Sequence, residues 1–225
     1  YTYIMYKKDL TLQLLLHQKL LPLYYHENAE VSIAILKALY DGGIKILEYT
    51  NRGESALKNF KKLKKEAKKN MPDLLLGIGT IKNVKHAKQF IKAGADFIVC
   101  PSINEEVSKI THNAGLLWIP GCMTPTEIAA AEDCGATIVK IFPGNILGPS
   151  YINSITEIFS NIKFIPTGGV ETEENNLREW FASGVVAVGM GSKLIRKNLV
   201  EEKKYGEITR LTKNVMDIIN SIKTI

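Results

Sequence analysis

The sequence predicts an α/β protein: a single (β/α)8 TIM barrel domain, residues 1–225, with a short N-terminal helix. Eight runs of β-type apolar residues recur along the chain, and stretches with helical patterning separate them. Strands that alternate with helices indicate βαβ units and a parallel sheet. No linker, low-complexity tract or charge boundary divides the 225 residues. Eight units in one undivided chain favour a closed barrel at the short end of its usual size range.

The predicted strands are short, and most end in small or polar residues. They are "LPLYYH" (21–26), "IKILEYT" (44–50), "LLLGIGT" (74–80), "FIVCP" (97–101), "LLWIPG" (116–121), "TIVKIFP" (137–143), "KFIPTGG" (163–169) and "VVAVGMG" (185–191). An open, doubly wound sheet is the alternative fold. That fold has a glycine-rich phosphate-binding turn after its first strand. This chain has "YYHENAE" there, so the barrel is favoured.

Helix signals fall between these runs. Residues 28–43 and 83–95 carry helical patterning and end on glycines that can cap a helix. Residues 124–136 do the same, and they open with a capping-box pattern, "TPTE", in which Thr124 is the N-cap. Each of these stretches therefore has its own helix start or stop signal.

Both ends of the chain are also predicted to be helical. The last helix, from about Glu207, places on one stripe Ile208, Leu211, Val215, Ile218, Ile219 and Ile222. Residues 1–19 place a basic pair before leucines, as a signal peptide does. Polar residues interrupt that run, and no small-residue cleavage site follows it. We therefore expect a short amphipathic helix there.

The composition is that of an ordinary globular protein, with 45% hydrophobic and 23% charged residues. The formal net charge of +6 favours anionic partners, but seven lysines lie in "KNFKKLKKEAKK", residues 58–69. Apolar residues at helical spacing accompany them, which is typical of a solvated helix face. The stretch has neither partner aromatics nor a recognised binding motif, so nucleic-acid binding is not expected.

Cysteine and histidine usage gives little sign of special chemistry. The three cysteines show neither CxxC spacing nor an even count, so a reduced, cytoplasmic setting is expected. Cys100 and Cys122 end strands and are expected to pack there. No cluster has the spacing of metal ligands, so no metal is predicted. His26 ends strand one near the predicted site. The remaining histidines, His17, His86 and His112, are interpreted as helix-surface residues. No apolar run approaches the roughly 18 residues that cross a bilayer, so no membrane partner is expected.

Polar residues collect at the carboxyl ends of the predicted strands, where such barrels carry their chemistry. Strand two ends in Glu48, Thr50 and then Arg52, and strand six carries Lys140 inside an apolar run. Side chains alternate along a strand, and strands two and six lie opposite one another in a ring of eight. If both polar faces point inward, Lys140 and Glu48 confront each other across the mouth of the barrel.

A lysine within an apolar strand is rare without a purpose. One interpretation is a structural ion pair between Lys140 and Glu48, although desolvation offsets the attraction in such pairs. The other interpretation is catalysis. Burial disfavours the ammonium form, and a neutral lysine attacks carbonyl groups to form Schiff bases. The catalytic interpretation is favoured.

Anion-binding features surround this pair. Two glycine motifs, "TGGVETEE" and "GMGSKL", follow strands seven and eight, where loops of such barrels frequently bind phosphate through backbone N–H groups. The alternative is two tight turns that need glycine. Arg52 and Thr80 end neighbouring strands, and a guanidinium with a hydroxyl suits a carboxylate. The alternative for Arg52 is a surface salt bridge. The two glycine motifs together favour a phosphate-binding site, and Arg52 with Thr80 favours a carboxylate-binding site.

In order and spacing, "ILEYTNRG", "GIGT", "CPS", "IPGCMTPTE", "KIFPG", "IPTGGV" and "GMGSKL" resemble the 2-keto-3-deoxy-6-phosphogluconate (KDPG) and 4-hydroxy-2-oxoglutarate (KHG) aldolases. That family consists of trimeric class I aldolases on a (β/α)8 barrel. The resemblance implies that Lys140 is the Schiff-base lysine and Glu48 the acid/base glutamate. It implies that Arg52 and Thr80 hold the pyruvyl carboxylate. The remaining implied substrate-binding residues are Pro101 and Phe142, and, at the phosphorylated end, Thr167, Gly168, Gly169, Gly191 and Ser192.

The function that the resemblance implies is cleavage of KDPG, a phosphorylated keto acid, to pyruvate and glyceraldehyde 3-phosphate. A cytoplasmic homotrimer without metal or organic cofactor would perform it. Cys100, Cys122 and the "FPGNILGPSY" loop depart from the family pattern. The substrate is therefore open, with 2-keto-3-deoxy-6-phosphogalactonate and 4-hydroxy-2-oxoglutarate as alternatives. Two further alternatives are a phosphate-barrel isomerase or synthase, which would not need Lys140, and a non-catalytic sugar-acid-phosphate binding barrel.

Overall fold

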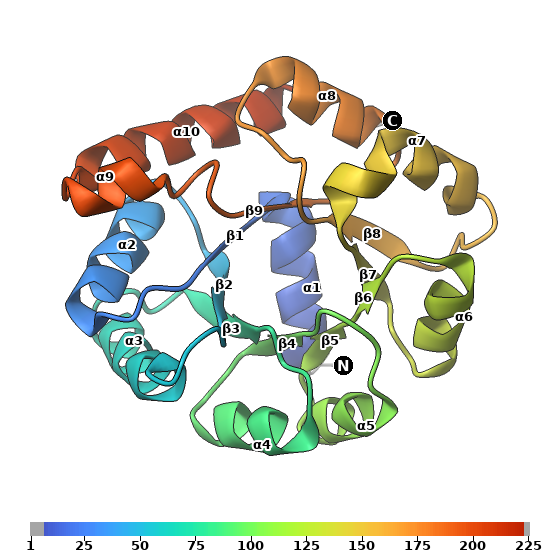
Figure 1. Ribbon diagram of the computed structural model, residues 1–225, viewed down its shortest axis with the longest axis horizontal. Helices are drawn as coiled ribbons and strands as arrows, with labels where there is room; N and C mark the ends of the chain where they lie inside the picture. Colours follow the sequence, from blue (N-terminus) through green and yellow to red (C-terminus); the bar gives the residue numbers. More distant parts are fainter. Residues whose placement is uncertain (1–6, 223–225) are drawn as a thin grey trace, which may run out of the picture.

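The computed structural model describes residues 7–222, in which helices and strands alternate along the chain. The strands are β1 (Leu20–Tyr24), β2 (Ile46–Thr50), β3 (Leu75–Gly79), β4 (Phe97–Val99), β5 (Leu117–Ile119), β6 (Gly121–Cys122), β7 (Ile138–Ile141), β8 (Lys163–Pro166) and β9 (Val188–Met190). The helices are α1 (Lys7–Gln18), α2 (Ala29–Asp41), α3 (Ala56–Asn70), α4 (Val84–Lys92), α5 (Glu105–Asn113), α6 (Pro125–Asp133), α7 (Gly144–Thr156), α8 (Glu174–Ala182), α9 (Lys197–Glu201) and α10 (Tyr205–Ser221). The strands surround a common centre, and the helices α2 to α10 form a layer outside them (Figure 1).

All the strand pairs of these sheets are parallel, so the predicted α/β class with a parallel sheet is confirmed. One sheet has the order β5-β4-β3-β2-β1-β9 and the other β6-β7-β8. Pro120, which has no N–H to donate, separates β5 from β6. At the other junction an isolated bridge joins Thr167 to Gly189. Within residues 7–222 the strands therefore form two curled sheets that meet at these points, rather than one continuous ring of eight hydrogen-bonded strands.

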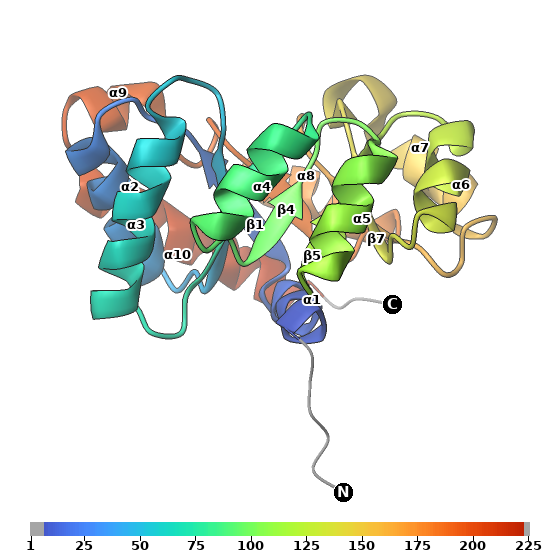
Figure 2. The same cartoon turned by 90° about the horizontal axis from the view of Figure 1, so that it is seen from below.

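An inner core fills the space between the strands. Its buried members are Leu15, Leu21, Ile46, Phe97, Val99, Leu117, Ile119, Ile138, Ile165 and Ala187. Leu15 belongs to α1, which lies beneath the strands at the ends where they begin (Figure 2). The Gln18 side-chain oxygen accepts hydrogen bonds from the backbone N–H groups of Lys45 and Ile46. The predicted N-terminal helix is thus present from Lys7, and it closes the end of the sheet opposite the predicted site.

A larger outer core lies between the strands and the outer helices. The predicted helix signals are confirmed there: Thr124 caps α6 in a capping box, and Ile208, Val215 and Ile219 of the predicted last stripe are buried. On α3 the apolar residues face the core and six of the seven lysines are exposed, as a solvated face requires. The seventh, Lys64, pairs with Asp96 at 2.6 Å.

The sequence does not predict two features of the helices. Helix α9 has no predicted counterpart, and α7 is broken at Gly148, whose φ of 71° lies in the left-handed region and is followed by Pro149. Within the described part of the chain, no helix has the length and apolar character needed to cross a membrane.

Candidate active site

Lys140 and Glu48 face each other inside the strands, as the alternation of side chains predicts. Lys140 lies on β7 two residues after Ile138, and Glu48 lies on β2 two residues after Ile46. Both isoleucines belong to the inner core, so both polar side chains also point inward. Nζ of Lys140 is 3.7 Å from Oε2 of Glu48, and the two side chains are 9% and 1% exposed. The result is a buried ion pair above the inner core.

The carboxylate of Glu48 has open hydrogen-bonding capacity. Neither of its oxygens has a hydrogen-bond partner among the described residues, and the distance to Lys140 exceeds that of a charge-assisted hydrogen bond. Buried polar atoms are rarely left in this state, because they lose water without a replacement. A purely structural ion pair needs its remaining lone pairs satisfied to offset desolvation. The geometry therefore favours a carboxylate that takes its hydrogen bonds from a ligand or a water molecule.

Gly79 on β3 makes room for this carboxylate. A Cβ atom at Gly79 would lie 1.6 Å from Oε1 of Glu48, so any side chain there would displace the glutamate. A Cβ atom at Gly77, two residues earlier, would lie 2.3 Å from the ring of Phe97. Sequence analysis missed the role of Gly79. The available signal was the pair of glycines at alternate positions of "LLGIG", since glycine inside a strand often marks a close approach.

A cavity of 530 Å³ opens at the carboxyl ends of β1, β8 and β9. Several predicted substrate-binding residues line it: Arg52, Phe142, Thr167, Gly168, Gly169, Gly191 and Ser192. Phe142 connects the cavity to the ion pair, because Nζ of Lys140 is 5.5 Å from the centroid of its ring. The structure thus brings the phosphate-end residues into one cavity and sets the lysine amine beside it.

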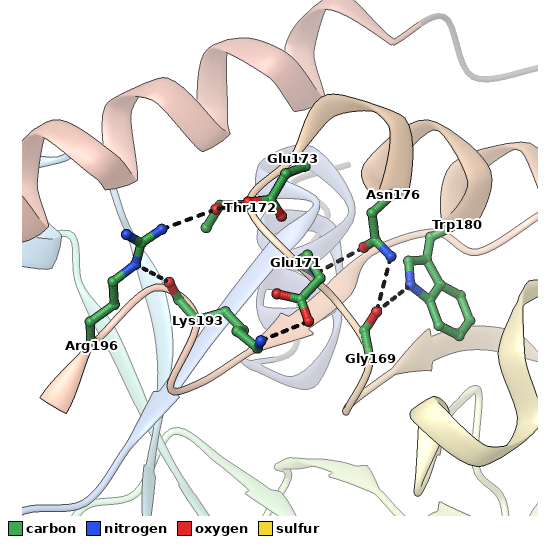
Figure 3. Close-up of polar contacts among 8 residues, drawn as sticks. All are labelled: Gly169, Glu171, Thr172, Glu173, Asn176, Trp180, Lys193 and Arg196. Atoms are coloured by element: carbon green, nitrogen blue, oxygen red, sulfur yellow. Dashed lines mark hydrogen bonds and ion pairs between the residues drawn. The ribbon is translucent and has the colours of Figure 1, made fainter.

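The loop after β8 turns through two glycines with left-handed backbone conformation. Gly168 and Gly169 have φ values of 93° and 72°, which explains why glycine is needed in this turn. The carbonyl oxygen of Gly169 accepts hydrogen bonds from Asn176 Nδ2 and Trp180 Nε1 of α8, each at 3.1 Å (Figure 3). A trans peptide points its C=O and N–H in opposite directions, so the N–H of Val170 is directed away from α8. Val170 lines the cavity, and such N–H groups suit an anion.

Arg52 and Thr80 are also brought together, since both line a second cavity of 320 Å³. Arg52 lines the larger cavity as well, so it stands between the two. Its side chain is exposed and makes no ion pair with any residue from 7 to 222, so the surface salt bridge is not observed. Thr80 has a φ of 60°, which is unusual for a β-branched residue. Strained residues of this kind cluster at functional sites.

Tyr25, at the end of β1, supports the loop that carries Arg52. Its hydroxyl lies 2.8 Å from Oγ of Ser55, and a Cβ atom at Gly53 would lie 2.2 Å from the same hydroxyl. The sequence does not indicate this role of Tyr25, because the contact joins segments that are far apart in the chain.

Pro101 lines neither of these two cavities, and Glu48, Thr80 and Lys140 also do not line the larger one. Pro101 is half-buried, and a Cβ atom at Gly121 would lie 2.5 Å from its carbonyl group. Gly121 is the register partner of Lys140 across β6 and β7. Pro101 therefore lies near the strand beside the lysine, not at the phosphate end.

The buried thiols pack as predicted. Burial raises the pKa of the Cys100 thiol to about 12, while the nearby Trp118 N–H, which donates to Sγ at 3.3 Å, opposes that rise. Burial also raises the pKa of Cys122 to about 12. Neither thiol is a ready nucleophile at neutral pH.

His26 lies at the candidate site, and His17, His86 and His112 lie on helices. His26 lines the larger cavity, as predicted, and His17 is exposed on α1. His86 is half-buried, lies 3.2 Å from the Asn51 amide and lines the cavity of Arg52 and Thr80. His112 is half-buried against the ring of Trp118. His86 and His112 thus lie on helices, as predicted, with tertiary contacts to half of each side chain. Across residues 7–222, His, Cys, Asp and Glu side chains form no group of three or more that could hold a metal ion.

Comparison with known proteins identifies the family of this chain. The family model for KDPG and KHG aldolase matches residues 12–211. A 2-dehydro-3-deoxy-phosphogluconate aldolase of Treponema pallidum is 30% identical over 202 residues, which cover 89% of this chain and 93% of that protein. A 2-dehydro-3-deoxy-6-phosphogalactonate aldolase of Escherichia coli is 36% identical over 123 residues, which cover 54% of this chain and 59% of that protein.

A solved structure extends the likeness to the fold. The crystal structure of a KDPG aldolase from Legionella pneumophila, with pyruvate captured as a covalent carbinolamine intermediate, has a TM-score of 0.80 at 27% identity. The match covers 90% of this chain and 96% of that chain.

The matched residues include every strand of the two sheets and both members of the buried ion pair. The protein is an aldolase, an enzyme that makes or breaks a carbon–carbon bond. More narrowly, the chain belongs to the KDPG and KHG aldolase family.

Proposed function

We propose that this protein is a class I aldolase that cleaves KDPG to pyruvate and glyceraldehyde 3-phosphate through a Schiff base on Lys140. The observation that carries the proposal is the buried Lys140 amine, 3.7 Å from a Glu48 carboxylate that has no hydrogen-bond partner among residues 7–222. A proton moved from the lysine to the glutamate leaves a neutral amine, and a neutral amine is the nucleophile that carbonyl chemistry needs.

The first half of the reaction builds an electron sink. The Lys140 amine adds to the C2 ketone of the substrate to give a carbinolamine. The proton held by Glu48 passes to the carbinolamine hydroxyl, which leaves as water; this gives an iminium ion and returns Glu48 to its carboxylate form. Glu48, directly or through a water molecule, removes the proton of the C4 hydroxyl. The electrons of the C3–C4 bond move towards the iminium, C4 becomes an aldehyde, and glyceraldehyde 3-phosphate leaves. Lys140 then carries an enamine.

The second half restores the enzyme. Glu48 returns its proton to C3 of the enamine, which regenerates the iminium, and water hydrolyses this to pyruvate and free Lys140. One carboxyl group thus acts first as base and then as acid. Its open hydrogen-bonding capacity supports both roles, since the substrate hydroxyl or a water molecule can donate to it.

The two ends of the substrate fit two groups of residues. Arg52 and Thr80, which line one cavity, are suited to the carboxylate. The glycine loops after β8 and β9 line the other cavity and are suited to the phosphate. Arg52 lies at both, so a single elongated substrate can reach from one group to the other. Phe142 lines the path past Lys140.

Pyruvate release across a small panel of keto acids tests the substrate. KDPG is expected to give the highest kcat/KM, ahead of 2-keto-3-deoxy-6-phosphogalactonate and 4-hydroxy-2-oxoglutarate. The galactonate epimer is the second candidate, because the 36% identical relative is named for it. Release from the epimer at a higher kcat/KM would replace KDPG as the substrate. No release from any member, or release unchanged in Lys140→Met, would reject the proposal.

We also propose that the protein works as a cytoplasmic homotrimer whose two sheets together form the closed (β/α)8 barrel of the family. Family membership supports this. Sedimentation equilibrium of the full chain measures the assembly directly. A mass of three chains is expected, and a monomer at working concentration would contradict it.

A further inference from the structure

Two side-chain contacts tie the loop after β8 (residues 167–173) to the loop after β9 (residues 191–196), as Figure 3 shows. Nζ of Lys193 lies 2.9 Å from Oε1 of Glu171. The Arg196 guanidinium donates to Oγ1 of Thr172 at 3.5 Å. These loops carry the glycines of the proposed phosphate site, so the contacts lie beside that site.

Lys193 differs from Glu171 in its relation to the cavity. Lys193 lines the larger cavity next to Ser192, whereas Glu171 does not line it. The Arg196 Nε–H donates to the Lys193 carbonyl oxygen at 3.3 Å, which fixes the backbone from which the lysine side chain extends. The lysine can therefore turn towards a ligand in the cavity, while its present partner stays outside.

The backbone of Glu171 is held in place by Asn176 of α8. Its backbone N–H donates to Oδ1 of Asn176 at 2.8 Å, and the same amide donates from Nδ2 to the Gly169 carbonyl oxygen at 3.1 Å. One asparagine thus fixes both the glycine turn and the start of the acidic segment. The backbone of Glu171 is therefore held beside the cavity, with its carboxylate within reach of Lys193.

The ion pair itself is weak enough to be exchanged. The Lys193 and Glu171 side chains are 58% and 35% exposed, and exposed ion pairs contribute little because solvent screens them. A phosphate carries more negative charge than a carboxylate and would compete for the ammonium. The other lysine of the cavity, Lys197, is 88% exposed and lies 3.6 Å from Glu201 within α9, so it is less constrained.

We propose that Lys193 is a specificity-determining residue: its ammonium rests on Glu171 in the free enzyme and moves to the phosphate of the bound substrate. This inference rests on the proposed phosphorylated substrate. It makes Glu171 a competitor of the phosphate for one cation. If the ion pair only held the two loops together, both residues would instead favour substrate binding.

The test compares Lys193→Met, Glu171→Gln and the double variant. For KDPG, Lys193→Met is expected to lower kcat/KM about tenfold, the loss of one charge-assisted contact. Glu171→Gln is expected to raise it about twofold to threefold, because the ammonium is released. The double variant should match Lys193→Met. Turnover of unphosphorylated 4-hydroxy-2-oxoglutarate should be unchanged in all three.

Lys109→Met is the matched control. Lys109 is also 58% exposed and pairs with Glu105 at 2.7 Å, but on α5. The Lys109→Met variant removes the same charge and is expected to change kcat/KM for KDPG by less than twofold. A loss of kcat/KM in Glu171→Gln as large as that in Lys193→Met would show that the ion pair only holds the two loops together, and would overturn the inference. An unchanged kcat/KM in Lys193→Met would also overturn the inference.

Binding of inorganic phosphate, measured by calorimetry, separates this inference from the proposed function. A Kd raised in Lys193→Met and lowered in Glu171→Gln supports the inference even if no keto acid is cleaved. Equal phosphate affinity in wild type and Lys193→Met overturns it, whatever the protein cleaves. An aldolase that is active only on unphosphorylated substrate, with no phosphate binding, also overturns it.

Discussion

Glu48 of β2 occupies the space that a side chain on Gly79 of β3 would fill, for a Cβ atom there would lie 1.6 Å from Oε1 of Glu48. The two residues lie on neighbouring strands of one sheet. The absence of a side chain at Gly79 therefore leaves room for the carboxylate at the place where it lies 3.7 Å from Lys140.

Gly79→Ala is expected to move Glu48 and slow catalysis strongly. A displacement of about 1 Å at a reacting group can cost about 100-fold in rate, so kcat for KDPG cleavage should fall by about that factor. Gly206→Ala is the control, because a Cβ atom there would contact nothing within 4 Å. The prediction is contradicted if the Gly79 and Gly206 variants retain the same kcat.

Glu48→Gln is expected to separate Schiff-base formation from cleavage. The amide keeps the shape of the side chain but cannot take or return a proton. Pyruvate should still form an adduct on Lys140, although more slowly because Glu48 no longer takes the lysine proton, while KDPG cleavage falls about 100- to 10,000-fold, the usual contribution of general acid–base catalysis. Stopped-flow and steady-state kinetics on one preparation measure both steps. Wild-type turnover in this variant would remove Glu48 from the mechanism.

Arg52→Ala is expected to weaken pyruvate binding without destabilising the fold. The guanidinium is exposed and has no ion-pair partner among the described residues. The thermal midpoint should therefore hardly change, because surface substitutions rarely exceed about 0.5 kcal/mol. Loss of a charge-assisted contact to the carboxylate should raise the pyruvate concentration needed for half-maximal trapping about tenfold or more.

Arg178→Ala is the matched control for that experiment, since Arg178 pairs with Glu174 on the exposed side of α8. It should leave pyruvate trapping as in the wild type. Equal behaviour of the two arginine variants would remove Arg52 from carboxylate binding.

The buried Cys100 thiol predicts a fall in stability at high pH. Burial raises its pKa from 9.0 to about 12 in the folded protein. Because the folded-state pKa is raised, the stabilisation is complete below about pH 9 and is lost as the pH rises towards 12. Each unit of pH in that window should cost about 1.4 kcal/mol for this thiol. The free energy of unfolding, measured by urea denaturation at a series of pH values, should fall less steeply with pH in Cys100→Ala than in the wild type. Equal slopes would show that the thiol ionises alike in both states.

The features that the sequence predicts well depend on local rules. Side-chain alternation along β2 and β7 and the order of strands were enough to place Lys140 opposite Glu48. Helix signals such as the Thr124 capping box depend on neighbouring residues alone. The cavity at the glycine turns could be predicted in outline because barrels of this kind carry their sites at the carboxyl ends of the strands.

The features that the sequence does not predict depend on contacts between distant segments. The fit of Glu48 against Gly79 requires the register of β2 and β3, and the pairing of Lys193 with Glu171 requires the relative heights of two loops. His112 looks like a surface residue until Trp118 is packed against it. The two-sheet ladder depends on how the chain passes Pro120, which a count of strands does not reveal.

Borohydride trapping with pyruvate, followed by peptide mass mapping, tests the central claim most directly. Reduction of the Schiff base should leave one stable pyruvyl adduct per chain, located on Lys140 and absent from Lys140→Met. An adduct on another lysine, or no adduct under conditions where pyruvate is released from KDPG, would contradict a mechanism through Lys140.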